Sequence, residues 1–183
     1  SGTTNDEFVR KNMDWLSMAS NWTKYTAVAS LGSVYRGHRE QSRHLLSQYL
    51  PKEGAVGSEY SEGGALFALG LVHAGFQDQW VMDFLLKVGG EGNGEVQKHG
   101  CCFGMGAAGF ATKDQQLLEE CKSVLFEDNA VSGEGAAVAI GLLMFGSSDC
   151  GLVEELLAYA KETKHDKIVR AIGVSVAMIL YNA

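Results

Sequence analysis

The chain repeats one pattern of residue sizes five times in 183 residues. With position zero set at Thr26, Gly64, Gly100, Gly135 and Ala171, successive units are 38, 36, 35 and 36 residues apart. Position six is small in every unit, and in four units it is a glycine: Gly32, Gly70, Gly106 and Gly141. A fixed period between about 20 and 50 residues is the signature of stacked structural repeats. The chain is therefore predicted to form one domain of repeats rather than several unrelated domains.

Each unit is predicted to be a pair of helices, and the sequence shows no strand pattern. The first helices have apolar residues around most of their circumference, which predicts burial on two sides; they are expected at 23–35, 62–74, 96–110, 133–145 and 168–181. The second helices are amphipathic and should form an outer layer; they are expected at 44–50, 114–126 and from 152 onward. The corresponding division is a leading helix at 5–22, repeats at 23–60, 61–95, 96–130 and 131–166, and a half repeat at 167–183.

Residues at the predicted turns agree with this division. Position eleven is expected to end the first helix as a left-handed C′ residue; it is Gly37, Gly75 or Gly146 in three units, and Ala111 or Asn182 in two others. Position fourteen is expected to cap the next helix; it is an acid in four units, Glu40, Asp78, Asp114 and Asp149. Pro51 cannot continue a helix and is expected to end the first outer helix.

The glycines at position six need a physical reason. Glycine inside a helix is less favourable than alanine by about 1 kcal/mol. Glycine is needed where two helices pack so closely that their backbones leave no room for a Cβ atom. The first helices of neighbouring units are therefore expected to pack unusually close together.

Composition excludes several classes of protein. The net charge is −7, and residues 61–183 hold eight Lys and Arg against sixteen Asp and Glu, which argues against a nucleic-acid surface. Cys101, Cys102, Cys121 and Cys150 lack metal-ligand spacing, so reduced, buried thiols of an intracellular protein are expected. No signal-peptide pattern is present, and the uncharged run at 135–148 is short for a membrane span. No cofactor is expected.

Two motifs suggest catalytic or nucleotide chemistry, and both have a simpler interpretation. Residues 104–109 match GxGxxG, with Glu127 and Asp128 about 20 residues on, but the dinucleotide motif needs a preceding strand. Glu62 and Glu134 could be the paired acids of a helical-barrel hydrolase. Acids do not recur at that register in the other units, and acids in a first helical turn are common without catalysis.

The histidines and the basic residues near the first turn are candidate binding residues. The five histidines are His38, His44, His73, His99 and His165, and no serine or cysteine is expected to combine with them and a third partner. His73 and His99 adjoin buried helix ends and are expected to be satisfied core or capping residues. Arg36, Arg39 and Arg43 form either a solvated turn or a docking patch for an acidic partner.

Four stretches resemble a known repeat family: NDEFVRKNMDWL at 5–16, EGGALFALGL at 62–71, GEGAAVAIGLLMFGS at 133–147 and YAKETKHDKIVR at 159–170. They are similar to the proteasome/cyclosome repeat family. The resemblance implies an all-α, α-α superhelix that is an arc of a closed toroid. It implies a non-catalytic scaffold in the base of the proteasome regulatory particle, in ubiquitin-dependent protein degradation. The implied partners are other regulatory-particle subunits, namely the ATPase ring, the lid and a ubiquitin receptor, in cytoplasm and nucleus.

A peptide-binding helical-repeat module of another complex and the helical-barrel hydrolase are the alternatives. A tetratricopeptide array has a similar period but needs a proline in each repeat, and the chain has one proline. In either case, terminal units of a solenoid normally need a polar cap. The last helix is expected to expose Ile172, Val176 and Ile179, so the isolated chain is expected to self-associate through its ends.

Overall fold

The computed structural model describes residues 5, 7, 11, 18–52, 58–90 and 94–182. In this part the chain is helical and has no strand, so the predicted all-α repeat fold is confirmed. The inner helices are α3 (Asn21–Val34), α5 (Glu59–Val72), α7 (Glu95–Ala108), α9 (Ala130–Leu143) and α11 (Asp166–Ile179). The outer helices are α4 (Ser42–Leu46), α6 (Gln79–Gly90), α8 (Gln115–Phe126) and α10 (Cys150–Glu162), with a 3-10 turn η1 (Arg39–Gln41) before α4.

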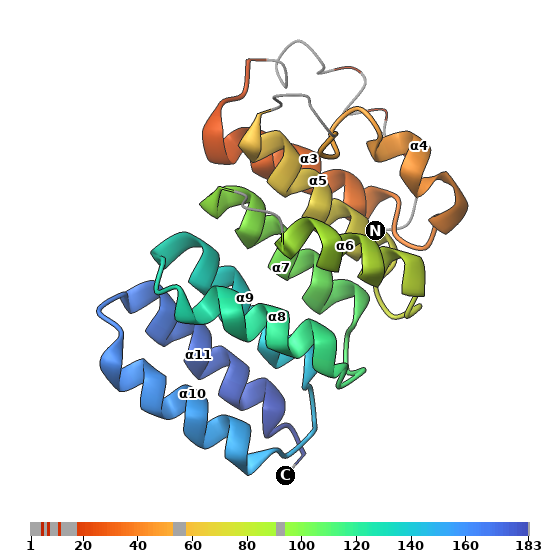
Figure 1. The fold of residues 1–183 in the computed structure, drawn as a ribbon. Coiled ribbons are helices and arrows are strands. Elements are labelled where there is room, and N and C mark those ends of the chain that lie inside the picture. The colour runs from red at the N-terminus through yellow and green to blue at the C-terminus, as the bar shows by residue number, and fades with distance from the viewer. Residues whose placement is uncertain are drawn as a thin grey trace.

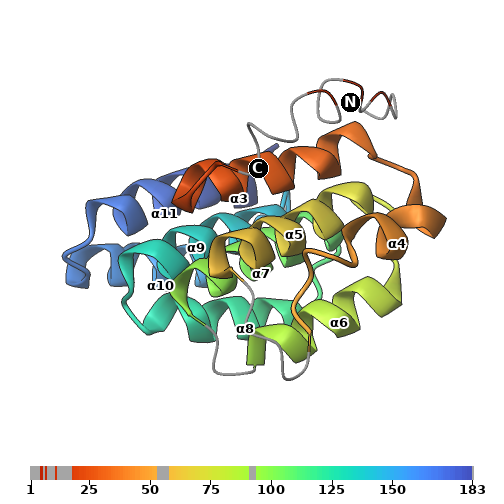
Figure 2. The same cartoon turned by 90° about the horizontal axis from the view of Figure 1, so that it is seen from above.

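The helices form two layers. Inner helices pack side by side in chain order, from α3 through α5, α7 and α9 to α11 (Figure 1). The outer helices lie on one side of this row (Figure 2), and α8 packs against both α7 and α9. Leucines such as Leu69, Leu85 and Leu117 are completely buried between the layers. Burial of these side chains is the main contribution to the stability of the fold. The hydrophobic effect is roughly proportional to the apolar area removed from water, and the two layers remove such area along their whole contact.

Position six of each unit lies against position four of the next unit. A Cβ atom placed on Gly106 would lie 2.8 Å from the Cα atom of Ala139, and one on Gly141 would lie 2.7 Å from Cα of Ser175. A Cβ on Gly32 would lie 2.6 Å from the carbonyl oxygen of Ala68. Gly70 meets the backbone of Gly104 in the same way. Backbone-to-backbone contact of this kind leaves no room for a side chain.

The turn after each inner helix has a left-handed residue at position eleven. The φ angle is +86° at Gly37 and +64° at Gly146, and the same conformation occurs without glycine at Ala111, at +58°. These residues are the second after the C-cap rather than the first, so the predicted C′ placement is wrong by one residue. The reason is a hydrogen bond between units: Gly37 N–H donates to the carbonyl of Val72 at 2.9 Å, and Ala111 N–H donates to Leu142. The turn of one unit thus satisfies the open end of the next inner helix.

The predicted helix caps are partly right. Asp114 accepts from the N–H groups of Gln116 and Leu117, and Asp149 accepts from that of Leu152. Glu40 lies inside η1 and caps nothing, so that prediction is wrong. Asp78 directly precedes α6, but its carboxylate is engaged by His73 and Arg39. Helix α4 ends at Leu46, well before Pro51, so the proline does not end it.

Helix α11 corrects the expectation for the last unit. Ile172 and Ile179 are buried against the preceding helices, and the exposed apolar side chains here are Val169, Val174 and Tyr181. The helix is therefore amphipathic, unlike the other inner helices. Cys101, Cys102 and Cys121 are free and buried as expected, whereas Cys150 is exposed.

Most of the predicted leading helix at 5–22 lies outside the described residues. Among the helices of the described part, none is long and apolar enough to cross a membrane.

Candidate interaction surface

The first two units are joined by a buried hydrogen-bonded chain that the sequence did not reveal. Ser42 Oγ at the start of α4 lies 2.8 Å from Nε2 of His73, and Nδ1 of His73 lies 2.7 Å from Oδ2 of Asp78. The expectation that no serine would combine with a histidine and a third partner is therefore wrong. Ser42 and His73 have no exposed surface, so a substrate could not reach the hydroxyl. The arrangement is structural and joins α4 to the turn between α5 and α6.

Burial sets the charge state of His73. Burial lowers the pKa of the imidazole below its ordinary value of 6.5, and the hydrogen bond from Nδ1 to Asp78 opposes this only in part. A neutral ring fits the bond to Asp78, because Nδ1–H donates to its carboxylate. The single proton of the Ser42 hydroxyl has two possible acceptors, Nε2 of His73 and the carbonyl oxygen of Arg39, which lies 2.7 Å from Oγ. His99 is likewise buried with a lowered pKa, and its Nδ1 donates to the carbonyl of Val131 at 2.7 Å. Both histidines are thus satisfied core residues, as the sequence indicated.

The three arginines of the predicted docking patch have different surroundings. Arg39 is paired with Oδ1 of Asp78 at 2.7 Å and lies over the ring of Phe76. Arg43 lies over the ring of Trp80, with Cζ 4.3 Å from the ring centroid. Arg36 is exposed and lines an apolar groove of about 410 Å³, whose described walls come from the inner helices and the turns that follow them. The described side chains of that groove include Phe67, Phe103 and Phe110.

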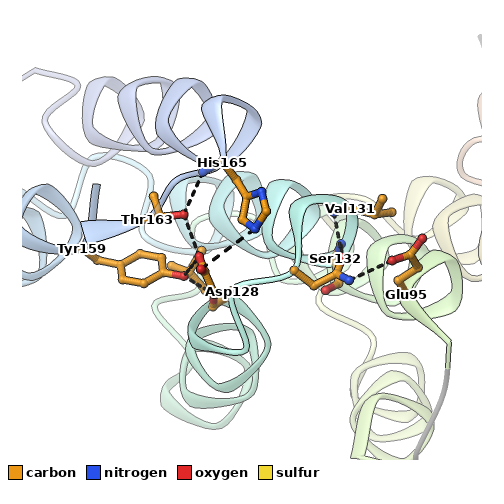
Figure 3. A network of polar contacts seen from close by, with 9 residues as sticks. Glu95, Asp128, Val131, Ser132, Tyr159, Thr163 and His165 are labelled. Atoms are coloured by element: carbon orange, nitrogen blue, oxygen red, sulfur yellow. Dashed lines mark hydrogen bonds and ion pairs between the residues drawn. The ribbon is translucent and has the colours of Figure 1, made fainter. Parts of the chain in front are cut away.

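The loops before α9 and α11 hold a second polar network (Figure 3). The Tyr159 hydroxyl lies 2.7 Å from Oδ1 of Asp128, and the Thr163 hydroxyl lies 2.6 Å from the same oxygen. His165 Nε2 is 4.0 Å from Oδ2 of Asp128. The hydrogen bonds from Thr163 and Tyr159 lower the pKa of Asp128. Burial, with Asp128 beside it, raises the pKa of Tyr159 to about 12. The network therefore fixes a loop of the third unit to the end of α10 in the fourth.

Two further polar pairs lie along the same edge, one between neighbouring units and one within the third unit. The Asn129 side chain donates to the carboxylate of Glu95 at 2.8 Å (Figure 3). Lys98 pairs with Glu127 at 2.6 Å. Asn129 and Glu95 are 34 residues apart, close to one repeat length, because equivalent loops of neighbouring units lie side by side. Lys98 and Glu127 belong to the same unit, so their pair joins the start of α7 to the end of α8.

The remaining candidate residues have structural surroundings. Residues 104–109 lie in α7 and at its C-cap, with no preceding strand in the described part of the chain. Glu62 is buried and accepts from the Gln97 side chain, whereas Glu134 pairs with Lys167 at 3.6 Å. The two glutamates lie on α5 and α9, which are separated by α7. Among the described residues, no three His, Cys, Asp or Glu side chains gather in a way that could hold a metal ion.

Comparison with known proteins identifies relatives along the whole chain. No protein-family model matches. The 26S proteasome non-ATPase regulatory subunit 1 of Drosophila melanogaster is 46% identical over 182 residues, which cover 100% of this chain. The non-ATPase regulatory subunit 1 homolog A of Arabidopsis thaliana is 46% identical, and the regulatory subunit rpn2 of Schizosaccharomyces pombe is 42% identical, each over 98% of this chain. The chain spans only 18% of the fly and plant proteins and 19% of the yeast protein. It belongs, as a segment, to the family of 26S proteasome non-ATPase regulatory subunit 1.

Proposed function

We propose that this chain is a non-catalytic scaffold segment of the base of the proteasome regulatory particle. In this role its repeats hold other subunits in fixed positions for ubiquitin-dependent protein degradation. The observation that carries the proposal is identity of 46% to a named proteasome regulatory subunit along the entire chain. The two-layer repeat array supports it, because stacked repeats present long, regular surfaces to partners.

The proposed partners are the ATPase ring, the lid and a ubiquitin receptor of the same particle, in cytoplasm and nucleus. The proposed larger shape is a closed toroid, of which these units form an arc. A docking role for Arg36, Arg39 and Arg43 is part of this proposal. Of these three, Arg39 is the one held in an ion pair within the described residues, so Arg36 and Arg43 are the better candidates.

The proposed lack of catalysis agrees with the surroundings of the candidate acids and bases. A catalytic pocket needs titratable groups that converge where a substrate can reach them. His73 is buried and bonded on both ring nitrogens, and Glu62 is buried and bonded to Gln97. Neither residue lines the groove between α4 and α6 or the apolar groove of the inner layer.

Native mass spectrometry of complexes purified through the tagged full-length protein tests the proposal. The expected result is a set of assemblies that contain ATPase and lid subunits of the 26S proteasome. Removal of residues 18–182 from the tagged protein should lose a subset of these partners, whereas Lys161→Glu on the exposed surface of α10 should lose none. A full-length protein that purifies alone, or with an unrelated complex, would refute the scaffold proposal.

A further inference from the structure

The outer layer is incomplete beside the first unit. Helix α4 has 5 residues, whereas α6 and α8 have 12 each and α10 has 13. The longer helices are close in length to the inner helices α5, α7 and α9, which have 14 residues each. The short α4 therefore leaves one flank of α6 without a full-length neighbour in the described part of the outer layer.

That flank of α6 carries large aromatic side chains at two positions where α8 and α10 have a polar residue or a glycine. Counted from the acid at position fourteen, Trp80 is equivalent to Gln116 of α8 and to Gly151 of α10. Phe84 is equivalent to Glu120 and Glu155. The third and fourth units of the same chain act as internal controls, so the aromatic residues at these two positions are a local feature of the second unit. An apolar surface of this kind marks an interaction site when it is rimmed by polar groups.

A groove of about 320 Å³ lies between α4 and α6. Its described walls include Leu50, Trp80 and Phe84, and Leu69 of α5 lies at its base and is completely buried. Arg43 and Lys52 also line the groove, and both are exposed. The groove therefore combines aromatic and aliphatic walls with two cations.

Neither cation is neutralised within the described residues, where no acidic side chain pairs with Arg43 or Lys52. The guanidinium of Arg43 instead lies over the Trp80 ring. A guanidinium that stacks in this way keeps the N–H groups of its edge available for a carboxylate. Much of the remaining surface is acidic, with sixteen acids against eight basic residues in 61–183. Charge complementarity therefore favours an acidic partner at this groove.

We propose that the groove between α4 and α6 is a docking site for an acidic segment of another protein. The segment inserts a large apolar side chain between Trp80 and Phe84 and places a carboxylate against Arg43 and Lys52. An amphipathic helix with acidic residues beside its apolar stripe has this chemistry, and helix-in-groove binding is a common mode of peptide recognition. The inference rests on the proposed scaffold function, because it names one surface through which the scaffold holds a partner.

Fluorescence anisotropy with a labelled probe peptide tests the inference on the full chain. The probe is a 15-residue helical peptide with Leu and Phe on one face and Glu beside them, and its matched control has every Glu replaced by Gln. We expect the acidic probe to bind and the Gln peptide to bind at least about tenfold more weakly. Equal binding of the two peptides would overturn the charge-complementary site.

Variants of the groove locate the binding. The double variant Arg43→Glu with Lys52→Glu reverses both cations, and Phe84→Glu installs the residue type found at the same position in α8 and α10. Each should weaken binding of the acidic probe at least about tenfold, whereas Lys161→Glu should leave it unchanged. Circular dichroism confirms that each variant is folded before the comparison. Equal loss in the Lys161→Glu control, or unchanged binding in both groove variants, would overturn the inference.

The scaffold proposal and the groove inference fail in different ways. A full-length protein that carries Arg43→Glu and Lys52→Glu and still purifies with every proteasome subunit, while the chain does not bind the acidic probe, removes the groove and leaves the scaffold. A full-length wild-type protein that purifies with no proteasome subunit removes the scaffold, whatever the probe does.

Discussion

Replacement of Gly106 by alanine separates helix propensity from packing, because the two effects have opposite signs. Propensity alone predicts that the alanine stabilises α7 by about 1 kcal/mol. The added Cβ atom would lie 2.8 Å from Cα of Ala139 and 3.1 Å from its Cβ. Carbon atoms in favourable contact are about 3.5 to 4.0 Å apart, so α7 and α9 must separate by roughly 1 Å.

The packing effect should be the larger one. Overpacking of a buried contact costs about 1 to 3 kcal/mol. After the propensity gain of about 1 kcal/mol is subtracted, we expect a net loss of up to about 2 kcal/mol in the free energy of unfolding. Gly106→Leu should lose more, because its whole side chain enters the same contact. The matched control is Gly173→Ala in α11, where an added Cβ atom meets nothing within 4 Å. That variant should gain up to about 1 kcal/mol from propensity.

Urea unfolding followed by circular dichroism at 222 nm measures both variants under the same conditions. The sign of the difference from wild type decides the question. If Gly106→Ala is as stable as Gly173→Ala, the contact between α7 and α9 does not exclude a side chain at position six, and the packing explanation for this glycine is wrong.

Three further predictions concern a turn, a buried histidine and the last helix. Ala111 has a φ angle of +58°, so Ala111→Gly should relieve about 1 kcal/mol of left-handed strain, and a lower urea midpoint would contradict this. Burial lowers the pKa of His73 in the folded state, so its contribution to stability is complete above its unfolded pKa, near 6.5, and is lost as the pH falls below it. His73→Gln should therefore flatten the fall in unfolding free energy between pH 7.5 and 5.5, and an unchanged slope would exclude this histidine as the cause. Val174→Glu with Tyr181→Glu should reduce self-association of the isolated chain in light scattering, whereas Ile172→Glu should unfold it, because Ile172 is buried and the other two are exposed. A strictly monomeric wild-type chain at high concentration would refute the role of this face.

The repeat period predicted the fold, because the small residues that define the period recur at the same positions in each unit. Gly106 and Gly141 are related by one repeat length, and each meets the fourth position of the next unit. The positions of the inner helices followed from this spacing to within a few residues. Their ends did not, because the turn residue Ala111 bonds to the carbonyl of Leu142 in the next unit, and that partner decides where the turn lies.

The polar contacts between units were not predictable from local motifs. Asp78 has the sequence position of a helix cap, but its carboxylate is used by His73 and by Arg39, which is 39 residues away. Asp128 and Thr163 are 35 residues apart. A search of the sequence for polar residues separated by one repeat length would have found Asp128 and Thr163. The chain from Ser42 to Asp78 departs from that rule, because Ser42 and His73 are 31 residues apart.

Electron cryomicroscopy of the particle purified through the full-length protein would show whether this segment is a scaffold of the regulatory particle. We expect the segment to be visible in the regulatory particle as a two-layer array, with α3, α5, α7, α9 and α11 stacked in chain order and other subunits in contact with its surface. A regulatory particle that assembles without the protein, or density in which the segment touches no other subunit, would contradict the account.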